Sequence, residues 1–191
     1  MIVVIDDFVK DEDLLKEIAS DKEFFSAAGE NYFFWEGWWS SPPDTIKKRL
    51  IKYVWGDNCP INMTFNVAGF EYWTGIQSAE DDNPFLDNLG LHYDKDEMLF
   101  QETGNLQTPI IGSVYYPDQN EFTGGMLEIF TKGHDKDPER IYAAPNRLII
   151  FDAGSVAHSV SKVTSGTRKA IAINLWGEEP YSYKIEKLKK E

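Results

Sequence analysis

Three side chains suited to holding one metal ion stand at two separated places in the chain. His92 and Asp94 lie two positions apart, and His158 follows much later. Because residues i and i+2 of an extended segment project to the same side, His92 and Asp94 can face one metal from one strand end while Tyr93 points away. Two imidazoles and one carboxylate on one face of Fe(II) leave the opposite face open for a co-substrate and O2. The sequence therefore predicts a mononuclear iron site completed by His158.

A basic residue, Arg168, begins the next strand-like segment after His158. Antiparallel neighbours joined by a short turn would bring Arg168 close to the region that His158 faces. Arginine suits this place because its planar guanidinium grips a carboxylate through two parallel hydrogen bonds. Taken singly, each residue has a plainer interpretation, a surface histidine or a solvated charge at a strand entry. The ordered set favours a metal site with a carboxylate-binding cation beside it.

The elements that must position these residues fall into two groups. A β-branched run at 2–5 predicts a strand, a helix follows after Asp11 as its N-cap, and 45–55 has the pattern of a second amphipathic helix. From residue 61 onward the pattern changes to short strands separated by turn signals. The expected strands are 63–67, 70–76, 89–93, 109–116, 126–130, 147–151, 158–163 and 168–176, and the charged tail at 183–191 is expected to be a frayed helix.

Helices followed by a run of roughly eight strands predict an α+β fold that is mainly β. The expected architecture is a double-stranded β-helix, or jelly roll, with the N-terminal helices packed on one sheet; a related barrel is the alternative. We expect residues 1–191 to form a single domain, in which 1–58 are a helical support layer and 61–177 the jelly-roll core. The aromatic cluster at 33–39 is expected in the core, with a substrate groove as the alternative.

Composition limits the classes of partner. Hydrophobic residues make up 42% of the chain, which is typical of a folded domain, and the formal net charge is −13. An acidic surface repels phosphate backbones, so we expect no nucleic-acid partner. The single cysteine, Cys59, fits a reducing compartment, and the sequence shows neither a signal peptide nor a long apolar run. We therefore expect a cytoplasmic protein that does not insert into a membrane.

Several segments carry a family resemblance. His92-x-Asp94, His158 and Arg168 resemble the iron and co-substrate signature of the Fe(II)/2-oxoglutarate-dependent dioxygenases. The run Tyr-Tyr-Pro at 115–117, followed by Phe-Thr-Gly-Gly-Met-Leu-Glu-Ile-Phe at 122–130, is similar to the corresponding run of prolyl hydroxylases. Residues 147–151 and 168–176 resemble two strands of their core. The likeness spans about 61–177, and within the superfamily it is greatest to the prolyl 4-hydroxylase group, including its oxygen-sensing branch.

The resemblance implies roles for individual residues. His92, Asp94 and His158 would bind Fe(II), and Arg168 would pair with the distal carboxylate of 2-oxoglutarate. Tyr116 matches the family tyrosine that hydrogen-bonds the same carboxylate, but strand alternation lets only one of Tyr115 and Tyr116 face inward. Tyr72 is a further candidate for the co-substrate pocket, with ordinary sheet packing as the alternative. Ascorbate would serve as a reductant.

The activity implied is hydroxylation of a prolyl residue in a peptide or protein, with release of succinate and CO2. Two alternatives stay open: a hydroxylase of a free amino acid or small metabolite, and a non-catalytic jelly-roll binding module with structural histidines. Two segments, 76–90 and 95–108, are longer or more polar than the family pattern leads us to expect. Both should lie at the mouth of the site, where they bear on the identity of the substrate.

Overall fold

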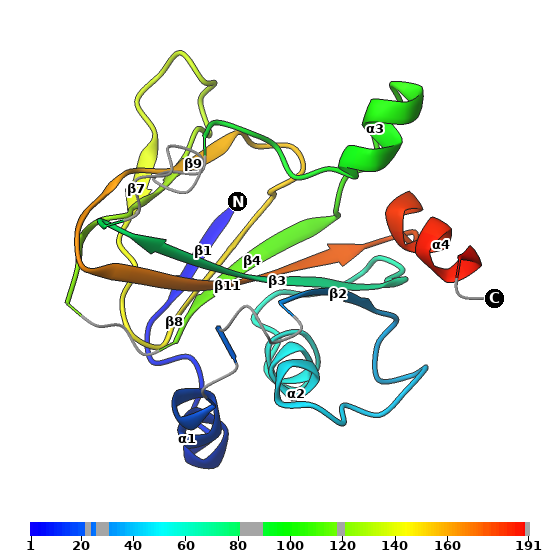
Figure 1. Cartoon of the computed structure of the whole chain (residues 1–191), viewed down its shortest axis with the longest axis horizontal. Helices are drawn as coiled ribbons and strands as arrows, with labels where there is room; N and C mark the ends of the chain where they lie inside the picture. The colour runs from blue at the N-terminus through cyan, green and yellow to red at the C-terminus, as the bar shows by residue number, and fades with distance from the viewer. Residues whose placement is uncertain (22–23, 26–30, 81–89, 118–120, 190–191) are drawn as a thin grey trace.

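The largest element of the structure is a six-stranded antiparallel sheet (Figure 1). A computed structural model describes residues 1–21, 24–25, 31–80, 90–117 and 121–189. Every neighbouring pair of strands in this sheet is antiparallel. The order across the sheet is β1 (Ile2–Ile5), β8 (Arg147–Phe151), β4 (Ile111–Tyr116), β11 (Thr167–Trp176), β3 (Gly69–Ser78) and β2 (Tyr32–Trp35).

A smaller β layer faces one side of this sheet. It contains a three-stranded sheet of β7 (Glu139–Ile141), β6 (Leu127–Ile129) and β9 (His158–Val160), and a pair of β10 (Val163–Ser165) with β5 (Thr123–Gly124). Figure 1 shows β7 and β9 above the long strands β3 and β11. Apolar side chains of both layers meet between them: Tyr116, Ile149, Phe151 and Ala170 from the large sheet, and Leu127, Ile129 and Val160 from the small one.

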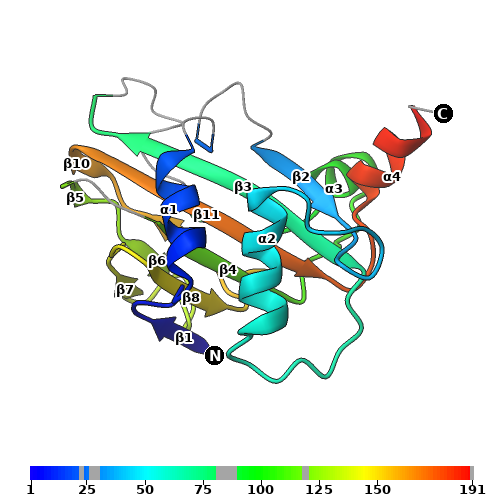
Figure 2. The same ribbon diagram turned by 90° about the horizontal axis from the view of Figure 1, so that it is seen from below.

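Two helices cover the opposite face of the large sheet, as Figure 2 shows. Helix α1 (Glu12–Ser20) begins at Asp11, whose side chain accepts hydrogen bonds from two backbone N–H groups of the first turn. Helix α2 (Ile46–Lys52) begins at the N-cap Thr45 and continues into a π-helical turn, η1 (Tyr53–Asp57). Both helices were expected from the sequence, and both N-caps hold the positions that their side-chain chemistry favours.

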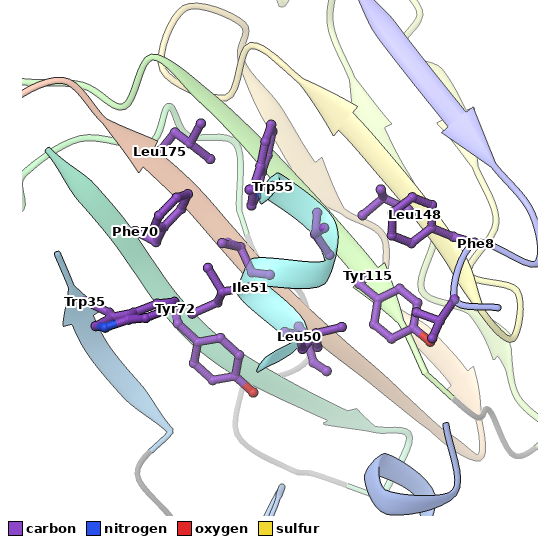
Figure 3. Packing of buried hydrophobic residues seen from close by; sticks show 14 of the residues in the cluster. Phe8, Trp35, Leu50, Ile51, Trp55, Phe70, Tyr72, Tyr115, Leu148 and Leu175 are labelled. Carbon is purple, nitrogen blue, oxygen red and sulfur yellow. The ribbon is translucent and has the colours of Figure 1, made fainter. Parts of the chain in front are cut away.

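The main core lies between these helices and the sheet. Leu50, Ile51 and Trp55 of α2 and η1 are fully buried, and Figure 3 shows them beside Phe70, Tyr72 and Leu175 of the strands. On β3 and β11 the residues facing the helices alternate with residues facing the small sheet, because successive strand side chains point to opposite faces. The side of β3 and β11 that faces the small sheet is therefore the side on which a site can form.

The structure differs from the sequence-based expectation at several segments. Residues 63–67 form an irregular connection between η1 and β3, and β2 lies in the aromatic stretch that was expected to pack without strand structure. A helix, α3 (Glu97–Thr103), forms within the polar segment 95–108 after the N-cap Asp96. Two expected segments lie partly outside the described residues: the acidic loop at its residues 81–88, and the turn 117–120 at its residues 118–120.

The C-terminal helix, α4 (Tyr181–Leu188), starts slightly earlier than expected. It lies against α3: the Tyr181 hydroxyl donates to Glu102 at 3.0 Å, and the Ser182 backbone N–H donates to Asp96 at 3.2 Å. Figure 1 shows both helices at the end of the sheet where β11 finishes. Within the described parts of the chain, no helix has the length and apolar character needed to cross a bilayer.

We expect the substitution Leu50→Ala to lower the free energy of unfolding by about 2–5 kcal/mol, because it removes buried methyl groups and leaves a cavity between α2 and the sheet. Urea unfolding followed by circular dichroism measures this change. Leu106→Ala is the matched control, since Leu106 is 68% exposed, and a loss there as large as at Leu50 would contradict the assignment of the core.

Candidate metal and co-substrate site

The backbone brings the three predicted ligands together. His92 and His158 form an antiparallel bridge in which each backbone N–H donates to the other residue's carbonyl, at 3.0 and 2.9 Å. The Asp94 N–H donates to the Ala153 carbonyl at 2.9 Å, which fixes the next part of the same segment. The potential ligand atoms of His92, Asp94 and His158 all lie within 4.8 Å of one another. The expected strand at 89–93 is reduced, in its described part, to this single bridge.

The orientation of both imidazoles suits a cation. Nδ1 of His92 lies 2.6 Å from the Gly90 carbonyl, and Nδ1 of His158 lies 3.0 Å from the Val156 carbonyl. A carbonyl can only accept, so each Nδ1 carries a proton and Nε2 is the ring nitrogen left to face Asp94 or a metal ion. Both Nε2 atoms lie 3.5 Å from Oδ1 of Asp94. That separation is long for a hydrogen bond and leaves room for a metal ion held by all three residues.

Asp94 is fixed by a neighbour that the sequence analysis did not single out. Oδ2 of Asp94 accepts a hydrogen bond of 2.9 Å from the Asn174 side-chain amide, which leaves Oδ1 toward the two imidazoles. Burial raises the pKa of Asp94, but interactions with His158 and His92 outweigh burial and hold the pKa well below its usual range. The carboxylate is therefore charged at neutral pH and ready to bind a metal.

Space for Asn174 comes from a glycine on the adjacent strand. Gly112 of β4 pairs with Asn174 of β11, and a Cβ at Gly112 would lie 2.5 Å from Oδ1 of Asn174. The backbone at Gly112 has no unusual φ, so the restriction there is one of space. A signal for Asn174 was present in the sequence, because it is a polar residue inside an otherwise apolar strand.

A cavity of about 230 Å³ extends from the three ligands between the two sheets. Arg168 and Gln77 line it, together with residues of β3, β4 and β11. Arg168 is 2% exposed; its Nη1 donates to Oε1 of Gln77 at 2.8 Å, and its Nη2 donates to the Tyr116 hydroxyl at 3.0 Å. Among the described residues, no carboxylate pairs with Arg168, and the donors Nε of Arg168 and Nε2 of Gln77 have no partner. A buried cation without an anion is costly, so this environment favours an anionic ligand.

The Gly-Gly step at 124–125 makes room for the arginine. Gly124 and Gly125 have φ values of +77° and +61°, in the left-handed region that glycine adopts readily. A Cβ at Gly125 would lie 2.8 Å from Cδ of Arg168. Both glycines therefore allow the left-handed backbone of this turn, and Gly125 also leaves the space that the side chain of Arg168 occupies.

The tyrosines of β4 point in opposite directions. Tyr116 joins the cluster between the two sheets and contacts Arg168, and its ring centroid lies 5.1 Å from the guanidinium carbon. Tyr115 lies in the helix-facing core, where its hydroxyl donates to Asn146 at 3.0 Å. The alternation of the strand thus places Tyr116 beside the arginine, and its role toward a co-substrate stays a prediction.

The expectation for Tyr72 needs correction. Tyr72 lies in the core under α2, as Figure 3 shows, and its ring stacks on Phe33 at 4.9 Å between centroids. On the same strand, Trp73 and Gln77 line the cavity. The strand itself was predicted correctly. The sequence did not show which of its alternating side chains face the helices and which face the cavity.

A second, open hollow of about 500 Å³ borders His92 and Asp94 from outside. His92, Asp94, Trp73 and Asn174 line both hollows, and Glu71 lines the outer one. All three ligands therefore line an inner cavity that ends at a buried cation, and two of them, His92 and Asp94, also line an outer hollow that is open to solvent. The third histidine, His134, lies in an exposed turn outside both linings.

Comparison with known proteins connects this geometry to a family. Residues 86–176 match the 2OG-Fe(II) oxygenase superfamily. No curated protein sequence matches the chain. A prolyl-4-hydroxylase from Pseudomonas putida is similar in structure, with a TM-score of 0.60 and 15% identity over 93% of this chain and 88% of its own.

Two further solved structures share the fold. NgTET1 in complex with 5mC DNA has a TM-score of 0.56 and 12% identity over 100% of this chain and 80% of its own. The viral collagen prolyl hydroxylase of Paramecium Bursaria Chlorella virus-1, solved with 2OG, has a TM-score of 0.50 and 13% identity over 93% of this chain and 96% of its own. At these identities the likeness establishes the fold.

We expect Asn174→Ala to weaken metal binding about 10- to 100-fold, because Asp94 loses the hydrogen bond that orients its carboxylate. Titration of the apoprotein with Mn(II), followed by electron paramagnetic resonance of the free ion, measures the affinity. The control is Asn105→Ala, which removes an exposed amide outside both linings. Unchanged Mn(II) affinity in Asn174→Ala would show that Asp94 is held in place by other contacts.

Proposed function

We propose that this member of the 2OG-Fe(II) oxygenase superfamily, a 2-oxoglutarate- and Fe(II)-dependent oxygenase, hydroxylates a prolyl residue in a peptide or protein. One observation carries the proposal. The triad His92, Asp94 and His158 lines an inner cavity that ends at a buried arginine, and His92 and Asp94 also line an outer hollow that a peptide side chain can enter. This arrangement separates a place for the co-substrate from a place for the substrate.

The residues present fit both groups. Two imidazoles with Nε2 lone pairs and a charged carboxylate match the donor set of non-haem Fe(II), and the unpaired donors at Arg168 and Gln77 match an anion. When bound, Fe(II) and 2-oxoglutarate supply the activation of O2 that hydroxylates an unactivated C–H bond and releases succinate and CO2. The chain itself orients the ligands, through Asn174 and the two backbone carbonyls, and encloses the inner site.

Arg168 and Tyr116 are the residues that we propose for the distal carboxylate of 2-oxoglutarate. Tyr116 accepts from Arg168, so its own O–H hydrogen is free to point toward a carboxylate oxygen. Arg168 keeps its Nε–H unpaired, and its charge is buried. A carboxylate would satisfy both donors at once.

The prolyl substrate is supported by the structural neighbours and by charge. Two of the three structures described above are prolyl hydroxylases by name. NgTET1, solved with 5mC DNA, shares the fold, but a net charge of −13 opposes binding to a phosphate backbone. A peptide or protein is therefore the substrate class that we favour over nucleic acid.

We also propose that the two β layers are the halves of a double-stranded β-helix and that the chain acts as one unit. The inner cavity between the layers supports the first point. The second is supported by α1 and α2, which share a continuous core with the large sheet.

The direct test is reconstitution with Fe(II), O2 and 2-oxoglutarate, with and without proline-containing peptides. We expect succinate that depends on Fe(II) and rises with peptide, together with a mass increase of one oxygen on proline. Asp94→Ala should abolish both products because it removes a metal ligand. Succinate that no peptide stimulates would keep the oxygenase chemistry and reject the prolyl substrate.

We expect Arg168→Gln to raise the KM for 2-oxoglutarate about 10- to 100-fold, since a hydrogen-bonded charge pair contributes about 1.5–3 kcal/mol. Succinate formation at varied 2-oxoglutarate measures this change. Lys169→Gln is the control, because Lys169 lies on the opposite face of β11, over the ring of Phe25. An unaltered KM in Arg168→Gln would reject the arginine as the co-substrate anchor.

A further inference from the structure

A buried carboxylate, Glu71, lines the outer hollow beside the metal ligands. Glu71 lies on β3 directly opposite Asn174 of β11, and Asn174 is the residue that holds Asp94. Residues opposite each other on neighbouring strands have Cβ atoms about 4.5–5.5 Å apart. Glu71 is therefore the direct cross-strand neighbour of Asn174, the residue that orients the metal ligand Asp94, and it lines the outer hollow.

The partners of Glu71 are neutral. Oε1 accepts from the Tyr32 hydroxyl at 2.6 Å, and Oε2 accepts from the Trp176 indole N–H at 2.9 Å. Glu71 is 8% exposed, and no lysine, arginine or histidine of the described chain forms an ion pair with it. Burial raises the pKa of Glu71, and the nearby Asp94 adds to that rise. A buried carboxylate normally has a cationic partner, and this one has none.

Glu71 retains capacity for a ligand. An ionised carboxylate offers about four acceptor positions; Tyr32 and Trp176 use two of them, and the side chain of Asn174 interacts with Glu71 as a third neutral partner. These contacts also fix the carboxylate in a single orientation. Both of its oxygens are thus held in place, with acceptor capacity left for a donor from the hollow.

The other charges of the hollow do not compensate Glu71. Lys95 is paired with Glu97 at 2.5 Å, and its ammonium lies over the ring of Phe100 at 5.2 Å. Asp94 is committed to the two histidines and the metal. The chain carries a net charge of −13, so its field attracts cations toward the opening. Glu71 is therefore the carboxylate of this lining that lacks a positive partner.

We propose that Glu71 binds a positively charged group of the substrate, an ammonium or guanidinium next to the residue that is hydroxylated. The inference rests on the proposed function for the position of the reacting carbon, and it narrows the substrate class. The substrate is a prolyl peptide with a basic side chain beside the proline, or one whose proline neighbours a free amino terminus. Glu71 acts as a specificity residue, because it contacts the substrate and does not bind the metal.

The first test compares peptides that differ in one charge. One pair has lysine or norleucine next to the proline, and a second pair has a free or an acetylated amino terminus beside it. We expect the wild-type enzyme to prefer the charged member of one pair about tenfold or more in kcat/KM, which corresponds to the lower range for a charge-assisted hydrogen bond. The pair that shows the preference identifies the source of the charge.

Two variants assign the preference to its residue. Glu71→Gln keeps the shape and removes the charge, and we expect it to abolish the preference. Glu97→Gln removes an exposed carboxylate of the same hollow, and we expect the preference to stay within about twofold of wild type, because solvent screens exposed charges. Equal kcat/KM for both members of each pair in the wild type would overturn the proposal without any variant.

A binding measurement separates this inference from the prolyl activity. The protein is loaded with Ni(II) and 2-oxoglutarate, which holds the site without turnover. The fluorescence of its tryptophans, including Trp73 of both linings and Trp176, which donates to Glu71, is titrated with the same peptides. Charge-dependent binding that Glu71→Gln removes, without hydroxyproline, would support Glu71 and reject the prolyl substrate. Hydroxyproline with no charge preference in rate or binding would support the prolyl substrate and reject the role of Glu71. The absence of both hydroxyproline and charge-dependent binding would reject both proposals.

Discussion

Strand β11 is buried on both faces and paired along both edges, and the remainder of the structure depends on this constraint. It pairs with β3 over its whole length and with β4 over its second half. Because side chains alternate, Ile171 and Ile173 fill the core under the helices while Arg168 and Asn174 face the site. A shift of one residue in register would move every one of these side chains to the wrong face, so core packing and site geometry are specified together.

The sequence contained the ligands but only part of their surroundings. The metal ligands could be predicted because few combinations of side chains in the chain suit a metal ion: His92, Asp94 and His158. The choice of Tyr116 over Tyr115 agrees with the position of Tyr116 beside Arg168. Tyr72 was misplaced because periodicity gives the alternation of a strand without saying which face meets the helices.

The same limit explains the errors in the fold. Strand β2 has the sequence Tyr-Phe-Phe-Trp, in which the exposed or partly buried positions and the buried positions are all aromatic, so no alternation marks it as a strand. Helix α3 has only seven residues and none of them is buried, so only its N-cap Asp96 and the left-handed Gly104 at its end mark it. Asn174 is different: its polarity within an apolar strand was a visible signal, but its partner Asp94 is distant in sequence and could be identified only from the fold.

In the proposed function, the charges of the site favour substrate selectivity in the outer hollow. Fe(II) would bring two positive charges and Arg168 one, while 2-oxoglutarate would bring two negative charges and Asp94 one, so the inner set would be neutral when filled. Neutrality within an enclosed cavity avoids the cost of an uncompensated buried charge. Glu71 lies outside this balance, in a lining whose other pair, Lys95 and Glu97, is already neutral. The negative charge left at the entrance can therefore discriminate among substrates without altering the balance that holds the metal and the co-substrate.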